Sequence, residues 1–337
     1  MPTITLGPTP GSERRVVPPG RVRLELAELV AHAQTGGLRL PFDTRAVEEA
    51  LEAGDGPRFA TDEARRAWHA RLSPDTPPAE DVVAEVIAGQ VDRVRSARPE
   101  RTPETDAARA ATMQALGVLS APEALLDVEL GLRRGAGLPD LARAWVAVRG
   151  EVAASLGTVT GAEFELSWGG IGALPEMLAH LLRLPPQVRE HPVAVLPARF
   201  TMPVELLAAA EVGAARHRED LLPALVERFP GAITGDGEEP YDAARGLALL
   251  HEVREQTTAQ LRVMVAGSRA DGQPVGGAGL VVWMRLGDQW YSLEPDVVAG
   301  VPVGRASAVA PRDLARSVGP VLARVLGRDR QSGDGDD

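Results

Sequence analysis

The same order of secondary-structure signals occurs twice in this chain of 337 residues. In residues 104–185, and again in residues 241–327, a helical pattern is followed by three strand patterns and a second helical pattern. A glycine-containing loop separates the first two strands each time. A recurring order favours a fold made of two similar halves, because each half offers the same apolar surfaces for burial. A chance match between two common α+β arrangements is the alternative.

Strict alternation marks the strands of the first half. Leu126, Val128 and Leu130 alternate with Asp127 and Glu129, which is typical of a strand with one covered face. Further strands are predicted over 142–149 and 164–168, and helical spacing returns over 174–184. The expected fold class is α+β, with a central antiparallel sheet in pseudo-two-fold halves and a helical bundle.

One strand of the second half does not alternate. Strands are predicted over 261–265, 280–286 and 289–293, and the run Leu280–Met284 is apolar throughout. Such a run indicates a central strand covered on both faces, or a partly exposed strand that is completed by a partner.

A single domain is expected over residues 21–327, with the two halves inside it. Residues 1–20 are rich in Pro, Gly and Thr and are predicted to form a flexible lead. Residues 328–337 are polar and acidic and are predicted to be a disordered tail.

The composition excludes several classes of protein. The formal charge is −11, so a phosphate backbone would be repelled and nucleic acid is not an expected partner. The chain has no Cys, which excludes a disulfide scaffold, a thiolate nucleophile and any Cys-bound metal. No signal-peptide pattern occurs, and no apolar run approaches the roughly 18 residues of a membrane span. A cytoplasmic location without membrane insertion is expected.

No catalytic motif is complete, so no enzyme activity and no cofactor are predicted. The nearest motif is His251-Glu252-Val253-Arg254-Glu255, which has Glu255 where the zinc-protease pattern requires a second His. A metal-assisted hydrolase that uses His251, Glu252 and Glu255 is the alternative function. A solvated helix face explains the same residues.

Acidic residues at outward strand positions suggest a charged surface. Asp127, Glu129, Glu163 and Glu165 are predicted to share one sheet face. A solvated face accounts for them, and a surface for a basic partner is the alternative.

Residues 110–327 resemble the EspG family. The resemblance rests on the following stretches, together with the Pro-started final helix Pro311–Leu326: Ala121–Glu129, Ala144–Val148, Phe164–Trp168, Pro197–Leu206, Ala259–Val265 and Asp288–Pro295. It implies a pseudo-two-fold α+β fold. It also implies a cytosolic chaperone of type VII (ESX) secretion in actinobacteria that is not an enzyme. The implied partner is a PE–PPE pair, whose PPE protein is bound at its apolar helical tip and kept soluble for secretion. The secretion machinery is a further implied partner, and an unrelated α+β interaction module is the remaining alternative.

The resemblance also implies where the partner binds. In the family the contact involves a loop between early strands and the C-terminal helical part, which by position are Arg133–Leu141 and Val204–Thr257 here. The expected contact residues are Arg133, Arg134, Leu138, Leu141, Leu207, Val212, Leu222, Leu225, Trp283 and Trp290. Both Trp residues lie on predicted strands, where aromatic side chains are usually core but also anchor interfaces.

Overall fold

The structure is a computed structural model. It describes residues 20–45, 47–48, 90, 94, 103–133, 140–160, 163–184, 195–215, 218–237, 239–268 and 274–327. The predicted lead, apart from Gly20, and the predicted tail lie outside the described residues.

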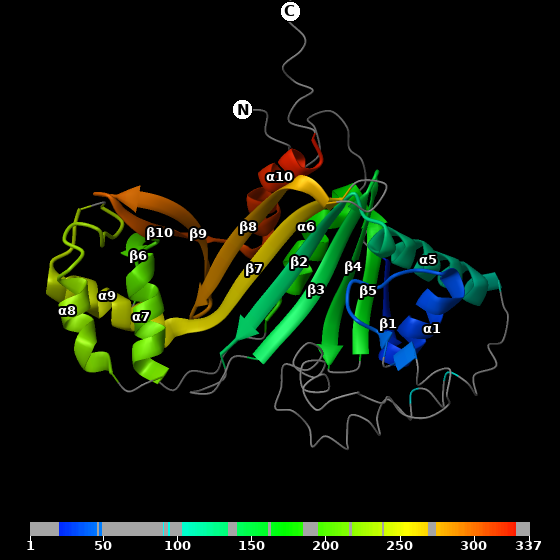
Figure 1. Cartoon of the computed structure of the whole chain (residues 1–337), viewed down its shortest axis with the longest axis horizontal. Helices are drawn as coiled ribbons and strands as arrows, with labels where there is room; N and C mark the ends of the chain where they lie inside the picture. The colour runs from blue at the N-terminus through cyan, green and yellow to red at the C-terminus, as the bar shows by residue number, and fades with distance from the viewer. Residues whose placement is uncertain are drawn as a thin grey trace, which may run out of the picture.

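Each half contributes five strands and a set of helices (Figure 1). The first half contains β1 (Gly20–Glu25), α1 (Leu26–Gly36), α5 (Pro103–Ser120), β2 (Ala124–Leu132), β3 (Asp140–Arg149), β4 (Val152–Thr160), β5 (Glu163–Gly170), the 3₁₀ turn η1 (Ile171–Ala173) and α6 (Leu174–Leu181). The second half contains β6 (Arg199–Pro203), α7 (Val204–Ala215), η2 (Glu219–Leu221), α8 (Leu222–Val226), α9 (Ala243–Gln256), β7 (Thr257–Ser268), β8 (Pro274–Leu286), β9 (Gln289–Val298), β10 (Val301–Val309), η3 (Pro311–Asp313) and α10 (Leu314–Val325).

The strands form one sheet whose order is symmetric. The ten strands run β1-β5-β4-β3-β2-β7-β8-β9-β10-β6, and neighbours pair antiparallel throughout. At each edge lies the first strand of a half, β1 or β6. The other four strands of that half follow as an antiparallel meander, which ends at the centre with β2 or β7. The predicted fold class, α+β with a central antiparallel sheet and pseudo-two-fold halves, is confirmed.

The symmetry axis passes through the pairing of β2 with β7. Val128 lies opposite Val263, and the register is symmetric about this pair. A half-turn there exchanges Leu126 with Leu261 and Leu130 with Val265. All of these side chains are buried, so both halves use the same positions for the core.

The structural repeat is longer than the predicted segments 104–185 and 241–327. The edge strands β1 and β6 and the helices α1 and α7 belong to equivalent places in the two halves. The strand β4 is missing from the sequence prediction. Its residues Ala153, Ala154 and Leu156 are fully buried, so both of its faces are covered and the alternation that signals a strand is lost.

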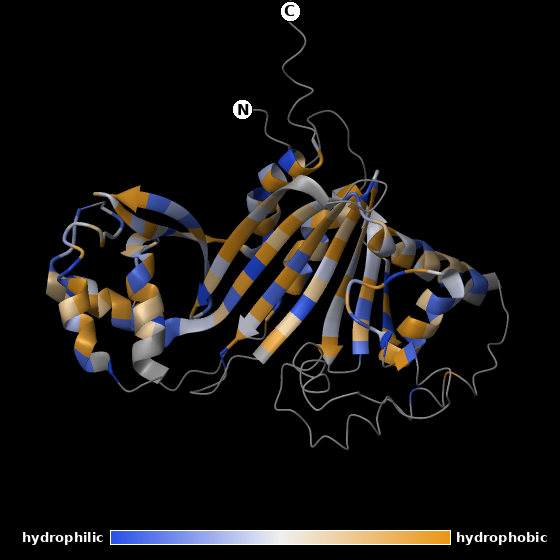
Figure 2. Cartoon of the chain, in the orientation of Figure 1, coloured by the Kyte–Doolittle hydropathy of each residue, from blue (hydrophilic) through white to orange (hydrophobic). Residues whose placement is uncertain are grey.

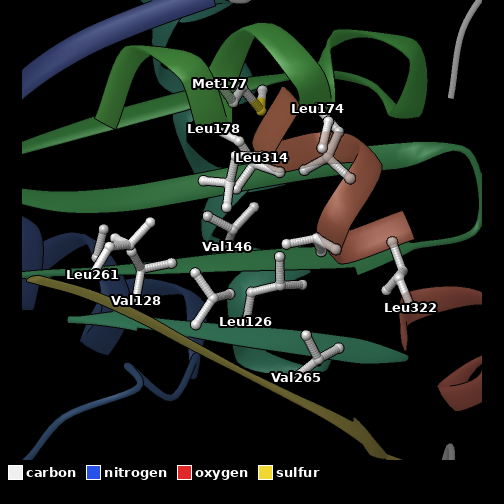
Figure 3. Packing of buried hydrophobic residues seen from close by; sticks show 14 of the residues in the cluster. Leu126, Val128, Val146, Leu174, Met177, Leu178, Leu261, Val265, Leu314 and Leu322 are labelled. Atoms are coloured by element: carbon white, nitrogen blue, oxygen red, sulfur yellow. The ribbon is translucent and has the colours of Figure 1, made fainter. Parts of the chain in front are cut away.

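Helices cover the two faces of the sheet differently. On one face, α6 and α10 pack together over the centre, and Figure 3 shows their side chains against those of β2, β3 and β7. Leu174, Met177 and Leu314 are buried in this layer to 1 % exposure or less. On the other face, α1 and α5 cover the first half, and α7, α8 and α9 cover the outer strands of the second half.

The contact between α10 and β8 requires a glycine. A Cβ added at Gly279 would lie 2.1 Å from Cγ1 of Val321 and 3.3 Å from its Cβ. Gly279→Ala is therefore expected to destabilise the fold by about 1–3 kcal/mol, as overpacking in a core does. Chemical denaturation measures this change.

A matched substitution and a double variant test the cause. Gly117 in α5 has no atom within 4 Å of an added Cβ, so Gly117→Ala should stabilise by roughly 0.5–1 kcal/mol. The pair Gly279→Ala with Val321→Ala should regain part of the loss. A neutral Gly279→Ala would contradict the packing.

Candidate partner-binding surface

The middle of the second sheet face is left open between two groups of helices. Figure 1 shows β2 and β7 uncovered, with α1 and α5 to one side and α7, α8 and α9 to the other. We call this surface the trough and define it by the side chains on the open face of three neighbouring strands. These are Asp127, Glu129 and Gly131 on β2, Gln260, Arg262, Met264 and Ala266 on β7, and Ala278, Leu280 and Val282 on β8.

The floor of the trough is a row along β7. Leu261, Val263 and Val265 are fully buried beneath α6 and α10, and the residues between them are exposed. Successive side chains of β7 therefore point alternately into the core and onto the open face. Figure 2 shows the resulting hydrophilic and hydrophobic bands along the central strands.

An ion pair between Arg143 of β3 and Asp127 of β2 borders the trough on the side of β3. Arg143 donates from Nε to Oδ1 of Asp127 over 2.9 Å and from Nη2 to Oδ2 over 2.5 Å. The guanidinium lies 5.5 Å from the ring centre of Trp145. The hydrogen bond to Asp127 raises the pKa of Arg143, burial opposes this, and the charges of Asp127 and Glu129 add to the rise. The pair is thus satisfied internally and needs no partner.

A second pair of opposite charges consists of the half-buried Glu129 and the exposed Arg262. Glu129 and Arg262 are cross-strand neighbours in the register of β2 and β7. Within the part of the chain that the structure describes, neither side chain has an ion-pair partner within 4 Å. These charges remain available to a bound molecule.

A hollow of about 280 Å³ opens at this end of the trough. It is lined by Glu129, Gly131, Arg133, Leu141, Thr257, Ala259, Gln260 and Arg262. Arg133 fixes its rim, since its backbone N–H donates to Thr258 O over 2.9 Å and its Nη1 donates to Arg254 O over 3.3 Å. The hollow therefore joins the end of β2 to the end of α9.

The other end of the trough is apolar. Met264 and Leu280 are opposite each other on β7 and β8 and are 54 % and 60 % exposed. Ala266 and Ala278 continue the patch toward the ends of the strands. The apolar run Leu280–Met284 is thus partly a covered central strand and partly an exposed one, because Trp283 and Met284 are buried and Leu280 is exposed.

The contact residues expected from the sequence fall into three groups. Arg133 and Leu141 line the hollow, and Leu141 is 46 % exposed. Leu207 and Leu225 are half-buried against the cluster of α7, α8 and α9. Arg134, Leu138 and the side chain of Val212 lie outside the described residues.

Three of the expected contact residues belong to the core. Leu222, Trp283 and Trp290 are 1 %, 0 % and 3 % exposed, so they lie beneath the surface in this structure. The two Trp rings are 6.3 Å apart between centroids. Met264 and Leu280 are exposed and were not among the expected contacts, and Leu280 belongs to the apolar run for which an exposed strand was one of two interpretations.

The predicted acidic row is split between the two faces, and that prediction is wrong. Asp127 lies in register with Trp145 on the open face, whereas Glu165 lies in register with Gly157 and Ala144 on the opposite face. There Glu165 contacts His180 of α6, with 2.8 Å between Oε1 and Nε2. The error arose because the apolar side chains of β2 pack under α6 and α10, whereas Phe164 and Leu166 of β5 pack under α1 and α5 on the other face.

The residues of the alternative metal site lie along α9. Glu252 accepts a hydrogen bond from Gln256 over 2.9 Å, and Glu255 is exposed. Among the described residues, no three His, Asp or Glu side chains are grouped to hold a metal ion. In the same residues, no helix is both long and apolar enough to span a membrane.

Comparison with protein-family models gives no match, and comparison with curated proteins gives none either. Among solved structures, the chain is similar to the type VII secretion system chaperone EspG5 of Mycobacterium tuberculosis, determined in complex with a PE25–PPE41 dimer. The identity is 12 %, the TM-score is 0.44, and the match covers 91 % of this chain and 97 % of the other.

Replacing one core and one surface residue tests the assignment of the expected contacts. Trp283→Ala removes a fully buried ring and should cost about 3–5 kcal/mol of stability. Leu141→Ala, at an exposed position, should change stability by less than about 0.5 kcal/mol. Thermal or urea unfolding followed by circular dichroism measures both, and equal losses would contradict the assignment.

Proposed function

We propose that this chain is a cytosolic chaperone of type VII secretion that binds the apolar helical tip of a PPE-like protein in a PE–PPE pair. The observation that carries the proposal is the hollow at one end of the trough. It is lined by Arg133 and Leu141, and Arg133 donates a hydrogen bond to Arg254 O near the end of α9, in the part of the fold that the resemblance to the EspG family implies.

The physical basis is the covering of an aggregation-prone surface. A helical hairpin with an apolar tip associates with other copies until its tip is buried. Leu141 offers an exposed apolar side chain at the hollow, and burying a side chain of that size contributes about 1.5–3 kcal/mol. Glu129, Arg133 and Arg262 surround it, and such rim charges favour one partner over another.

The acidic balance of the chain fits this role. A net charge of −11 keeps the chaperone and its complex soluble while an apolar surface is being exchanged. The partner is expected to dock as a preformed helical element, because the contact surface is built on strands and a helix end that the sheet holds in place.

Co-expression tests the proposal directly. Each PE–PPE-type pair encoded next to the gene for this chain is produced with it and analysed by size-exclusion chromatography. A ternary complex with one of these pairs is expected. Leu141→Glu should weaken binding at least tenfold, because it places a charge in the apolar contact.

The control is an apolar residue elsewhere that is more exposed than Leu141. Val297, on the β9–β10 hairpin, is 65 % exposed, and Val297→Glu should bind as the unaltered chain does. If no such pair co-elutes, the proposal fails, and an interaction module unrelated to secretion becomes the better account. Equal loss in both variants would remove the hollow as the binding site.

A further inference from the structure

A second hollow opens on the covered face of the sheet, which is the face opposite the trough. Its volume is about 640 Å³, within the range of roughly 300–1,000 Å³ that is usual for small-molecule sites. It lies between the residues Leu182–Leu184 after α6, the turn between β8 and β9, and the residues Ala308–Pro311 at the start of η3. It shares no lining residue with the trough or with the hollow of the proposed partner contact.

One residue of this second hollow is an almost fully buried arginine. The side chain of Arg285 is 8 % exposed, and its Nη2 donates to Oδ1 of Asp288 over 3.0 Å. The guanidinium carries five N–H donors, and it makes no other hydrogen bond with the described residues. Its unbonded N–H groups are not sealed from solvent, and the hollow that Arg285 lines gives an acceptor access to them. A desolvated cation of this kind gains free energy from an acceptor in the hollow.

The other half of the sheet shows that the fold does not require an arginine at this position. The half-turn that relates the two halves places Val148 of β3 at the position of Arg285 of β8. It places Ala153 of β4 at the position of Trp290 of β9. Val148 and Ala153 are both fully buried. Small apolar side chains therefore complete the core in the first half, whereas the second half has a cation and an aromatic ring beside a hollow.

Hydrogen bonds hold the wall of the second hollow in place. Gln289 donates from Nε2 to the carbonyl oxygens of Trp290 over 2.8 Å and of Val309 over 2.7 Å, and so joins β9 to β10. Thr258 donates from Oγ1 to Gly287 O over 3.0 Å and fixes the turn between β8 and β9. A site whose groups are already positioned loses less conformational entropy when a ligand binds.

The charges around the second hollow can balance one negative charge. Asp288 is paired with Arg285, and Asp313 accepts a hydrogen bond from Arg316 over 2.7 Å. Arg183 is exposed and has no ion-pair partner among the described residues. One positive charge is therefore left over, which favours a monoanion. A dianion would in addition meet the carboxylates of Asp288 and Asp313.

We infer that the second hollow binds a small organic carboxylate. The carboxylate accepts hydrogen bonds from the unbonded N–H groups of Arg285, because the planar guanidinium matches the two oxygens of a carboxylate. Arg183 supplies the balancing charge at the rim. The apolar body of the ligand lies against Trp290, Leu184 and Val309, which line the same hollow. This site is independent of the proposed chaperone function.

Titration calorimetry of the unaltered chain with simple carboxylates tests the inference. The probes are acetate, phenylacetate and indole-3-acetate, at constant ionic strength. Phenylacetate and indole-3-acetate should bind saturably at millimolar concentration, as small ligands of about ten to thirteen non-hydrogen atoms do, and acetate should bind more weakly. Phenylacetamide, which has the same shape without the charge, should bind at least tenfold more weakly than phenylacetate.

A substitution at the buried arginine tests where the carboxylate lies. Arg285→Met keeps an apolar stem and removes the charge, so it should weaken phenylacetate binding at least tenfold while the protein remains folded. Arg305→Met is the matched control, because Arg305 is also a strand arginine paired with an aspartate and lies outside the hollow. Its affinity for phenylacetate should stay within twofold of that of the unaltered chain.

Two milder variants keep the test decisive if Arg285→Met does not fold. Arg285→Lys retains the charge and loses the planar fork, and it should weaken phenylacetate binding about fivefold or more. Arg183→Gln changes an exposed side chain, so it should leave the unfolding curve unchanged and weaken binding about threefold. In nuclear magnetic resonance spectra, the Nε–H signal that is lost in Arg285→Lys should shift during the titration of the unaltered chain.

The remaining outcomes would overturn the inference. Absence of saturable binding for all three carboxylates removes the site. Equal affinity of the unaltered chain and Arg285→Lys, with no shift of the Nε–H signal, places any binding elsewhere. Phenyl phosphate binding more than tenfold tighter than phenylacetate would assign the hollow to a phosphate and overturn the carboxylate. None of these results depends on whether the chain binds a PE–PPE-type pair.

Discussion

The pairing of β2 with β7 is the interaction on which the rest of the structure depends. It joins the two meanders into one sheet and places Val128 opposite Val263 at the symmetry axis. The helices α6 and α10 can pack on each other only because this ladder brings the two halves together. The pairing of β2 with β7 therefore determines the environment of both faces at the centre of the sheet. One face is buried under α6 and α10, and the other lies between two separate groups of helices.

The two halves have similar residues at equivalent positions on the covered face of the sheet and different residues at equivalent positions on the open face. The half-turn about the axis exchanges Ala124 with Ala259 and Leu126 with Leu261, and all four are buried. On the open face the same operation exchanges Asp127 with Arg262 and Glu129 with Met264. Packing restricts the covered positions to apolar side chains of similar size, whereas the open positions are free to take on charges and exposed apolar groups. The trough is thus asymmetric on a symmetric sheet.

Sequence reasoning succeeded where one face of a strand is covered and failed where both are. The alternation in β2 and β7 predicts the covered and open sides correctly, since Leu126 and Leu261 are buried while Asp127 and Arg262 are not. In β4, Ala153 and Ala154 are both buried, and no period-two signal remains. Glu165 was assigned to the wrong face because the apolar side chains of β2 and β5 are covered by different helices on opposite faces of the sheet. Contact residues assigned by position along the chain could not separate Leu141 from Trp283, because exposure depends on how distant elements pack.

An exposed apolar patch on a sheet face favours association with other apolar surfaces, and Met264 and Leu280 form such a patch beside charged side chains. The Arg143–Asp127 pair, the half-buried Glu129 and the exposed Arg262 border the apolar side chains of Met264 and Leu280. Charged side chains beside an apolar patch oppose pairing with an unrelated sheet, because such pairing would bury them without partners.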